Sequence, residues 1–347
     1  MRNALADRAQ VVDLGVRYRT VPVWLMKAAH ARRADGRWVS TWKQSTLMDH
    51  YCAWDLSRHR YDKLDMVVEI GDLAVVDGPF ALYQDMSYDA LLQLYDGQLL
   101  QFPGLNREAI LRRRERQRMI YERASLIFAM SRWFADALER WSDVDPSKVR
   151  VLHPGTHLPS HGHSLPRSHR PAKSRRQRLL FVGRDFVRKG GDLVLAALAE
   201  LRRDHDPEIT LTVAGPAVWT GDADVPEGVD FLGSVSTRQV ARLLERHDLF
   251  VMPSRFEGFG IAFAEALSFG VPCVARDDFA MPELIRDGHN GGLVRSDRVD
   301  ELVAKILSVL TDDSIYDVVR REAGRVRTHF SWERAGEQVV REIATTL

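Results

Sequence analysis

The second half of the sequence alternates short apolar segments with longer segments whose apolar residues recur at helical spacing. Strand-like segments occur at 179–183, 209–215, 229–233, 248–254 and 271–276, and helical patterns at 189–203, 237–247 and 260–270. Strands that are apolar along almost their whole length are typical of a parallel sheet with helices on both faces. The region is therefore predicted to be an α/β domain whose ligands bind where the strands end.

The first half has the same kinds of element at less regular intervals. Short strands are predicted at 65–70, 79–85, 124–131 and 148–155, and a helix at 107–123. The strand at 124–131 ends at Ser131, which is expected to cap the helix that follows. The segment 159–178 has six basic residues, no acidic residue and several Pro, Ser and His. This composition predicts an exposed linker between a first domain, 1–158, and a second domain, 179–329.

Composition narrows the class of protein. The chain has 347 residues, 45% of them apolar, and a net charge of +1, so a disordered chain is excluded and no overall charge favours nucleic acid. Cys52 and Cys273 are the only cysteines, which indicates a reducing compartment. No apolar run reaches the roughly 18 residues of a membrane span, and the first residues lack the apolar core of a signal peptide. A soluble cytoplasmic protein is expected.

Two cations follow the strand at 179–183, in the sequence GRDFVRKGG. Arg184 comes directly after the strand, and Lys189 is predicted to open the next helix. Backbone N–H groups at a helix start attract anions, and arginine can bind phosphate oxygens in a bidentate manner. The spacing differs from that of a Walker A loop. The residues therefore predict an anion site, with a pair of ordinary surface cations as the alternative.

The second unusual segment is EGFGIAFAE, which follows the strand at 248–254. Glu257 precedes a predicted helix, and Glu265 lies within it, about two turns further on if both lie along the helix. Gly258 and Gly260 permit backbone N–H groups to come close to a ligand. Because a buried carboxylate needs hydrogen-bond donors, each glutamate is expected to bind hydroxyl groups of a different sugar. A nucleotide sugar offers a ribose, a hexose and a diphosphate between them.

These motifs, in this order, resemble retaining glycosyltransferases of family 4. The segment GHNGGLV at 288–294 is similar to their loop and strand after the donor site, and FSWERAGEQVVREI at 330–343 to their closing helix. The resemblance covers 124–347 well and the first 120 residues loosely. It implies an α/β fold of the GT-B type, with two Rossmann-like domains facing across a cleft. It also implies that 1–158 binds the acceptor, that 179–329 binds the donor, and that the helix at 330–347 crosses back.

The resemblance also implies roles for individual residues. Arg184 and Lys189 would hold the donor diphosphate, and Glu265 would hold the ribose. The transferred sugar would lie against Glu257 and the backbone amides of three residues, Gly258, Phe259 and Gly260. The predicted activity is retaining transfer of a hexosyl group from a nucleotide-diphospho-sugar to a glycan or lipid-linked acceptor, as in polysaccharide biosynthesis.

The sequence departs from the family pattern in two places. The usual opening strand and glycine-rich loop are not found, so the N-terminal domain is predicted to lack one strand and one helix. Where members often have a histidine after a strand of the N-terminal domain, this chain has Asp85. Asp85 is a candidate for contact with the sugar or the acceptor, and a turn or cap residue is the alternative.

Three other patterns carry less weight. The pairs Asp222–Asp224 and Asp143–Asp145 mimic a metal-binding Asp-x-Asp motif, but both lie in predicted loops, and no metal or other cofactor is expected. The linker histidines, 157, 161, 163 and 169, have irregular spacing and no nearby acid or cysteine. The helix at 107–123 carries seven arginines and three glutamates. It is interpreted as a solvated helix face, with peripheral contact with anionic lipid on the inner face of the plasma membrane as the alternative.

Two other functions stay open on this sequence. The first is a different enzyme on the same fold, a nucleotide-sugar epimerase or a phosphorylase. The second is a non-catalytic nucleotide-sugar-binding protein, which the missing opening unit would favour and the intact donor motifs oppose.

Overall fold

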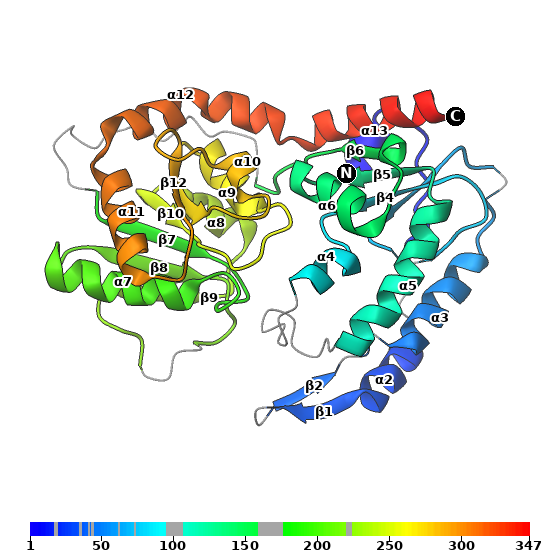
Figure 1. Cartoon of the computed structure of the whole chain (residues 1–347), viewed down its shortest axis with the longest axis horizontal. Coiled ribbons are helices and arrows are strands. Elements are labelled where there is room, and N and C mark those ends of the chain that lie inside the picture. The colour runs from blue at the N-terminus through cyan, green and yellow to red at the C-terminus, as the bar shows by residue number, and fades with distance from the viewer. Residues whose placement is uncertain are drawn as a thin grey trace. The chain divides into compact units, whose positions relative to one another are not determined.

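The structure is a computed structural model that divides the chain into two compact units (Figure 1). One unit combines Met1–His153 with Gly336–Leu347, and the other is Pro154–Ala335. The structure describes residues 1–16, 20–34, 37–40, 42, 45–61, 63–72, 74–94, 107–158, 176–219 and 224–347. Most of the predicted linker, 159–175, lies outside the described residues. No helix in the described ranges is both long enough and apolar enough to cross a membrane.

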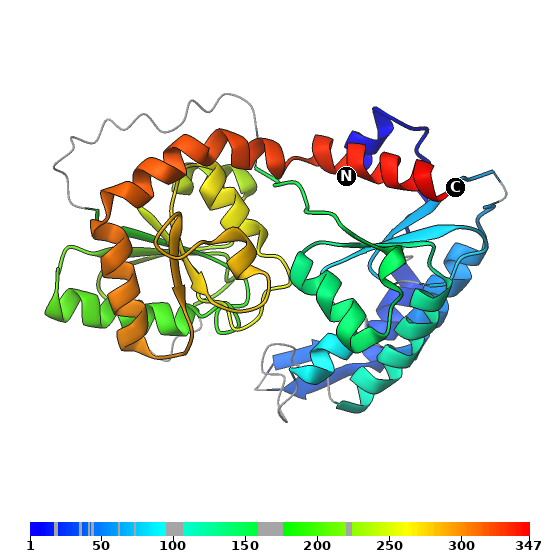
Figure 2. The ribbon, with the colours of Figure 1, turned by 45° about the horizontal axis from the view of Figure 1, so that its top comes forward.

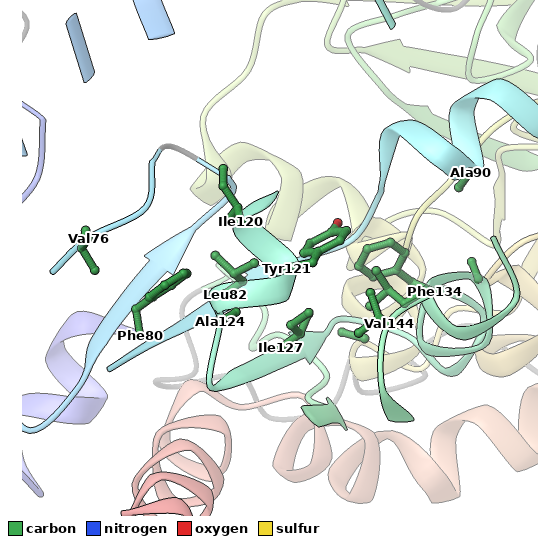
Figure 3. Close-up of a cluster of buried hydrophobic side chains, with 13 residues drawn as sticks. Val76, Phe80, Leu82, Ala90, Ile120, Tyr121, Ala124, Ile127, Phe134 and Val144 are labelled. Carbon is green, nitrogen blue, oxygen red and sulfur yellow. The ribbon is translucent and has the colours of Figure 1, made fainter. Parts of the chain in front are cut away.

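The first unit is built on a four-stranded parallel sheet in the order β3-β4-β5-β6. The strands are β3 (Val67–Ile70), β4 (Phe80–Gln84), β5 (Leu126–Ala129) and β6 (Val149–Val151). Its helices are α4 (Tyr88–Gln93), α5 (Arg107–Arg123) and α6 (Arg132–Ser142). Apolar side chains of the strands, such as Leu82 and Ile127, form one cluster with Ile120 of α5 and Phe134 of α6 (Figure 3). As predicted, the hydroxyl of Ser131 caps α6, accepting the N–H of Phe134 at 3.1 Å.

A smaller group of elements precedes this sheet. It comprises α1 (Arg2–Ala6), α2 (Thr20–Ala29), β1 (Ala31–Ala34), β2 (Arg37–Ser40) and α3 (Thr46–Ser57). Strands β1 and β2 pair with each other in antiparallel fashion, which the sequence analysis did not predict. Met26 of α2 and Met48 and Cys52 of α3 share a small apolar cluster, so the two helices pack together.

The basic helix α5 is held to its own unit by its arginines. Two of them, Arg114 and Arg118, donate to Asp89 at 2.6 and 2.9 Å, and Asp89 is buried. Arg113 is buried, 3.3 Å from Asp49 and 3.2 Å from the hydroxyl of Tyr88. Arg116 donates to the carbonyl oxygen of Asp72 at 3.0 Å. The predicted solvated face is therefore wrong in the middle of the helix, because a charge count cannot show which cations have buried partners.

The second unit contains a six-stranded parallel sheet in the order β12-β11-β10-β7-β8-β9. Figure 2 shows this unit in green to orange from a second direction. The strands are β7 (Arg178–Val182), β8 (Thr210–Ala214), β9 (Val229–Gly233), β10 (Leu249–Val251), β11 (Cys273–Arg276) and β12 (Gly291–Val294). The helices are α7 (Gly191–Asp204), α8 (Thr237–Leu244), α9 (Ile261–Ser268), α10 (Met281–Leu284), α11 (Val299–Thr311) and α12 (Asp313–His329). The predicted strands are confirmed, and the prediction that Lys189 opens a helix is wrong by two residues.

The last helix, α13 (Trp332–Thr346), contains residues of both units. Within the first unit, the side chain of Gln338 donates to the carbonyl oxygen of Val151 at 2.8 Å, and Glu342 pairs with Arg150 at 3.0 Å. Its C-terminal residues therefore pack on the parallel sheet of the first unit, next to β6.

Candidate active site

The order of strands in the second unit identifies where a ligand is expected to bind, at the carboxyl ends of two central strands. Strands β8 and β9 lie on one side of β7, and β10, β11 and β12 lie on its other side. Strands β7 and β10 are therefore neighbours at which the direction of the connections reverses, with Leu249 opposite Leu179. Ligands of open parallel sheets bind beyond the carboxyl ends of such a pair of strands. The two motifs singled out in the sequence follow β7 and β10.

The loop after β7 brings its cations to this edge by a tight turn. Arg184 is exposed and has no ion pair among the residues that the structure describes. Gly190 precedes α7 with φ +77°, and a Cβ there would lie 2.6 Å from the carbonyl oxygen of Pro253. The loop after β7 therefore packs directly on the loop after β10, and only glycine permits that approach.

The loop after β10 places Glu257 beside Lys189. The two side chains form an ion pair, and 14% of the lysine side chain and 12% of the glutamate side chain are exposed. Gly260, with φ +87°, forms the N-cap of α9, and a Cβ there would lie 2.7 Å from the ring of Phe263 and 3.1 Å from Cγ of Glu257. As predicted, Glu257 precedes the helix, so the separation expected if both glutamates lay along the helix does not apply to this pair. Gly258, Phe259 and Gly260 are all buried.

Glu265 is a buried carboxyl group on α9, with 9% of the residue exposed. Its Oε1 accepts the backbone N–H of His157 at 3.2 Å. Burial raises the pKa of Glu265 to about 7, and the single hydrogen bond from His157 offsets this only in part. The group is therefore poised to accept further hydrogen-bond donors. The contact with His157 could not be predicted, since it uses a backbone group far away in the sequence.

Four ionic side chains that the sequence analysis missed surround these loops. Arg255 pairs with Asp192 and Asp297, and Asp297 also pairs with Arg276. The only signal in the sequence was an arginine close behind a buried strand. Its partners are 63 residues before it and 42 residues after it, so no local pattern could have revealed them.

The remaining candidates lie elsewhere. Asp85 is an exposed residue after β4 in the first unit. Asp143 is the left-handed residue that ends α6, and Asp145 accepts the N–H of Ser147 at 2.8 Å, so this pair serves a turn. Asp222 lies outside the described residues, as do three of the linker histidines. In the part of the chain that is described, no cluster of three His, Cys, Asp or Glu residues could hold a metal ion.

The comparisons with solved structures agree with this architecture. The sucrose-phosphate synthase of Thermosynechococcus elongatus superposes with a TM-score of 0.69 over 91% of this chain and 82% of that one, at 17% identity. HepE of Anabaena, solved in complex with UDP-glucose, gives a TM-score of 0.58 over 77% and 72%, at 19% identity. The fold is α/β of the GT-B class, with a parallel sheet in each unit.

The sequence comparisons place the site within a known domain. Residues 167–326 match the family model described as glycosyl transferases group 1, so this part of the chain is a group 1 glycosyltransferase domain. A D-inositol 3-phosphate glycosyltransferase of Mycobacterium marinum is 30% identical over 213 residues, which is 56% of this chain and 45% of that protein. The chain thus spans about half the length of the curated relatives it matches.

Proposed function

We propose that the protein is a retaining glycosyltransferase of the hexosyl-transferring type, which uses a nucleotide-diphospho-sugar as donor. One observation carries the proposal: a cationic loop and a glutamate-bearing loop meet at the switch point of the sheet, inside the group 1 domain. In the proposed arrangement the second unit binds the donor and the first unit binds the acceptor.

The cations are assigned to the donor diphosphate. Arg184 is exposed at the carboxyl edge of β7, and Lys189 lies in the same loop. Negative charge develops on the diphosphate as the bond to the sugar breaks, and cations fixed at that place stabilise the transition state more than the bound donor. No metal ion or other cofactor is required in this scheme.

The carboxylates are assigned to the sugars. Glu265 would bind the ribose, because among the described residues its carboxyl group accepts one hydrogen bond, from the N–H of His157, and two hydroxyl groups would supply more. Glu257 would orient the transferred sugar together with the amides of Gly258, Phe259 and Gly260. It is not assigned as a nucleophile. Asp85 is proposed to contact the sugar or the acceptor from the first unit.

The choice of donor rests on a structural neighbour. HepE, a structural neighbour, was solved with UDP-glucose, which makes UDP-glucose the first donor to test. A glycan or lipid-linked acceptor and a cytoplasmic location are part of the proposal. Contact of α5 with an anionic membrane is a separate hypothesis, and the ion pairs of Arg113, Arg114 and Arg118 within the first unit reduce the charge available for it.

The experiment is a thermal-shift screen against nucleotide sugars, followed by turnover with and without an acceptor mixture. A ligand at about 100 times its Kd stabilises the folded state by roughly 2.7 kcal/mol. Transfer to an acceptor that persists with excess chelator supports the proposal. Conversion of the donor without an acceptor would indicate an epimerase, use of free phosphate a phosphorylase, and binding without turnover a non-catalytic protein.

A further inference from the structure

The guanidinium group of Arg255 is held at every nitrogen. Nη1 and Nη2 each donate to one carboxylate oxygen of Asp192, both at 2.8 Å, and Nε donates to Asp297 at 2.7 Å. Nη1 also donates to the carbonyl oxygen of Val187. A planar group with donors on two edges is needed to make these contacts together, and lysine cannot reproduce them.

The partners of Arg255 belong to segments that follow other strands. Val187 lies in the loop after β7, Asp192 lies in the first turn of α7, and Asp297 lies in the loop after β12. Asp297 also pairs with Arg276, the last residue of β11. Burial raises the pKa of Asp297, but hydrogen bonds from Arg255 and Arg276 outweigh it and keep the pKa below its ordinary value. The charged network therefore joins the segments at the carboxyl ends of β7, β10, β11 and β12.

Arg255 is close in sequence to Glu257, and it contacts the residue that precedes Lys189. The backbone N–H of Arg255 donates to the carbonyl oxygen of Arg188 at 2.9 Å. Lys189 follows Arg188 directly, and Glu257 is two residues after Arg255. The side chain adds to this link, because Nη1 of Arg255 donates to the carbonyl oxygen of Val187, two residues before Lys189.

We propose that Arg255 is a positioning residue, which fixes the spacing between Lys189 and Glu257 for the transfer step. This proposal rests on the proposed function. Arg255 acts through these two residues and not by contact with the donor. Stabilisation of developing charge requires groups that are held in place before the reaction, and a displacement of about 1 Å costs on the order of 100-fold in rate.

The test compares Arg255→Lys and Arg255→Ala with the wild type. Arg203→Ala is the matched control, because Arg203 also forms a two-bond pair, with Asp204, but at the far end of α7. Asp192→Asn is a second variant that keeps Arg255 and weakens its main contact. UDP-glucose, or the donor of the panel that the wild type turns over, is the probe. The measurements are kcat, KM, the Kd of the nucleoside diphosphate and the unfolding midpoint.

We expect kcat to fall about 10- to 100-fold in both Arg255 variants and in Asp192→Asn, with the Kd of the nucleoside diphosphate changed less than about 3-fold. Added guanidinium should restore part of the kcat of Arg255→Ala, whereas methylammonium should not. In a double-mutant cycle, the effects of Arg255→Lys and Lys189→Ala on kcat should be less than additive. Arg203→Ala should leave kcat unchanged.

Two results would overturn the proposal. One is a kcat of Arg255→Lys equal to that of the wild type. The other is a loss of kcat that only follows the fraction of unfolded protein and shows no response to guanidinium. If the wild type itself turns over no nucleotide sugar, the proposed function fails and the role of Arg255 falls with it. An active wild type with unaffected variants refutes the Arg255 proposal alone.

Discussion

Lys189 and Glu257 form an ion pair between the loops that follow two adjacent parallel strands, and both side chains are nearly buried. The ammonium group of Lys189, which is proposed to bind the donor diphosphate, is thus already paired with the carboxylate of Glu257, which is proposed to bind the sugar. Donor binding must therefore redistribute charge within the pair, since a dianionic diphosphate and Glu257 compete for one ammonium group.

This competition predicts the effect of Glu257→Gln. The substitution keeps the size of the side chain and removes its charge, so Lys189 becomes free to bind phosphate oxygens. We expect bare nucleoside diphosphate to bind about 1 kcal/mol more tightly than in the wild type. Sugar transfer should fall, because the hydroxyl groups of the sugar lose the carboxylate to which they donate hydrogen bonds. Calorimetry and a transfer assay on the same sample measure the two effects. Weaker binding of the bare nucleotide would show that Glu257 is not a competitor.

The two cations of the loop after β7 are predicted to contribute separately. Arg184→Ala and Lys189→Ala should each weaken nucleoside-diphosphate binding by roughly 1.5 to 3 kcal/mol, the scale of a hydrogen bond to a charged group. Lys189→Ala should also lower the unfolding midpoint, because it leaves Glu257 nearly buried without its partner. Arg184→Ala should leave the unfolding midpoint unchanged, since Arg184 is exposed. Unchanged diphosphate affinity in both variants, measured by calorimetry, would refute the site.

The sequence predicted the parallel strands of both units and the two loops of the site, because local apolar pattern and glycine content determine these features. It could not predict that Lys189 pairs with Glu257, since the two residues are 68 positions apart and their charges suit a ligand equally well. It also missed the partners of the arginines on α5. An arginine near a buried carboxylate and an arginine in water have the same signature in sequence, and only packing separates them.

The close approach of the two site loops predicts the cost of a side chain at Gly190. Gly190→Ala should destabilise the protein by about 2 to 3 kcal/mol, because it combines a left-handed backbone with a contact of 2.6 Å to the Pro253 oxygen. Gly288 has a similar φ of +69° but nothing within 4 Å of the added Cβ. Gly288→Ala is therefore the control for backbone strain alone. If denaturant unfolding gave the same loss of folding free energy for both variants, the contact between the two loops would contribute little to stability.

The arginines of α5 are predicted to stabilise the first unit and not to bind lipid. The double variant Arg114→Ala/Arg118→Ala leaves Asp89, 4% exposed, without these two partners and should cost about 3 kcal/mol of folding free energy. Co-sedimentation with anionic vesicles at low salt should be the same for this variant, for Arg112→Ala and for the wild type. Vesicle binding that either variant abolishes would instead support docking of α5 on a membrane.

Glu265 predicts how stability depends on pH. Its pKa is about 7 in the folded protein, above the ordinary value of 4.5, because the carboxyl is buried. Between these values the folded state binds more protons than the unfolded state, so the free energy of unfolding falls as pH rises from 4.5 to 7 and levels off above that. The full effect is on the order of 3 kcal/mol, from 1.36 kcal/mol per pKa unit. Glu265→Gln, which stays neutral, should lack this part of the slope.

The same group predicts how nucleotide binding depends on pH. Ribose hydroxyls donate best to the ionised carboxylate, so binding should lower the pKa of Glu265 and release a proton near pH 7. We expect nucleotide affinity to rise as pH rises from about 6 to 8 in the wild type. Calorimetry in buffers of different ionisation enthalpy counts the protons released. Glu265→Gln should bind more weakly and without proton release, whereas Glu257→Gln should keep the release. A proton count near zero in the wild type would mean that the ribose does not contact Glu265.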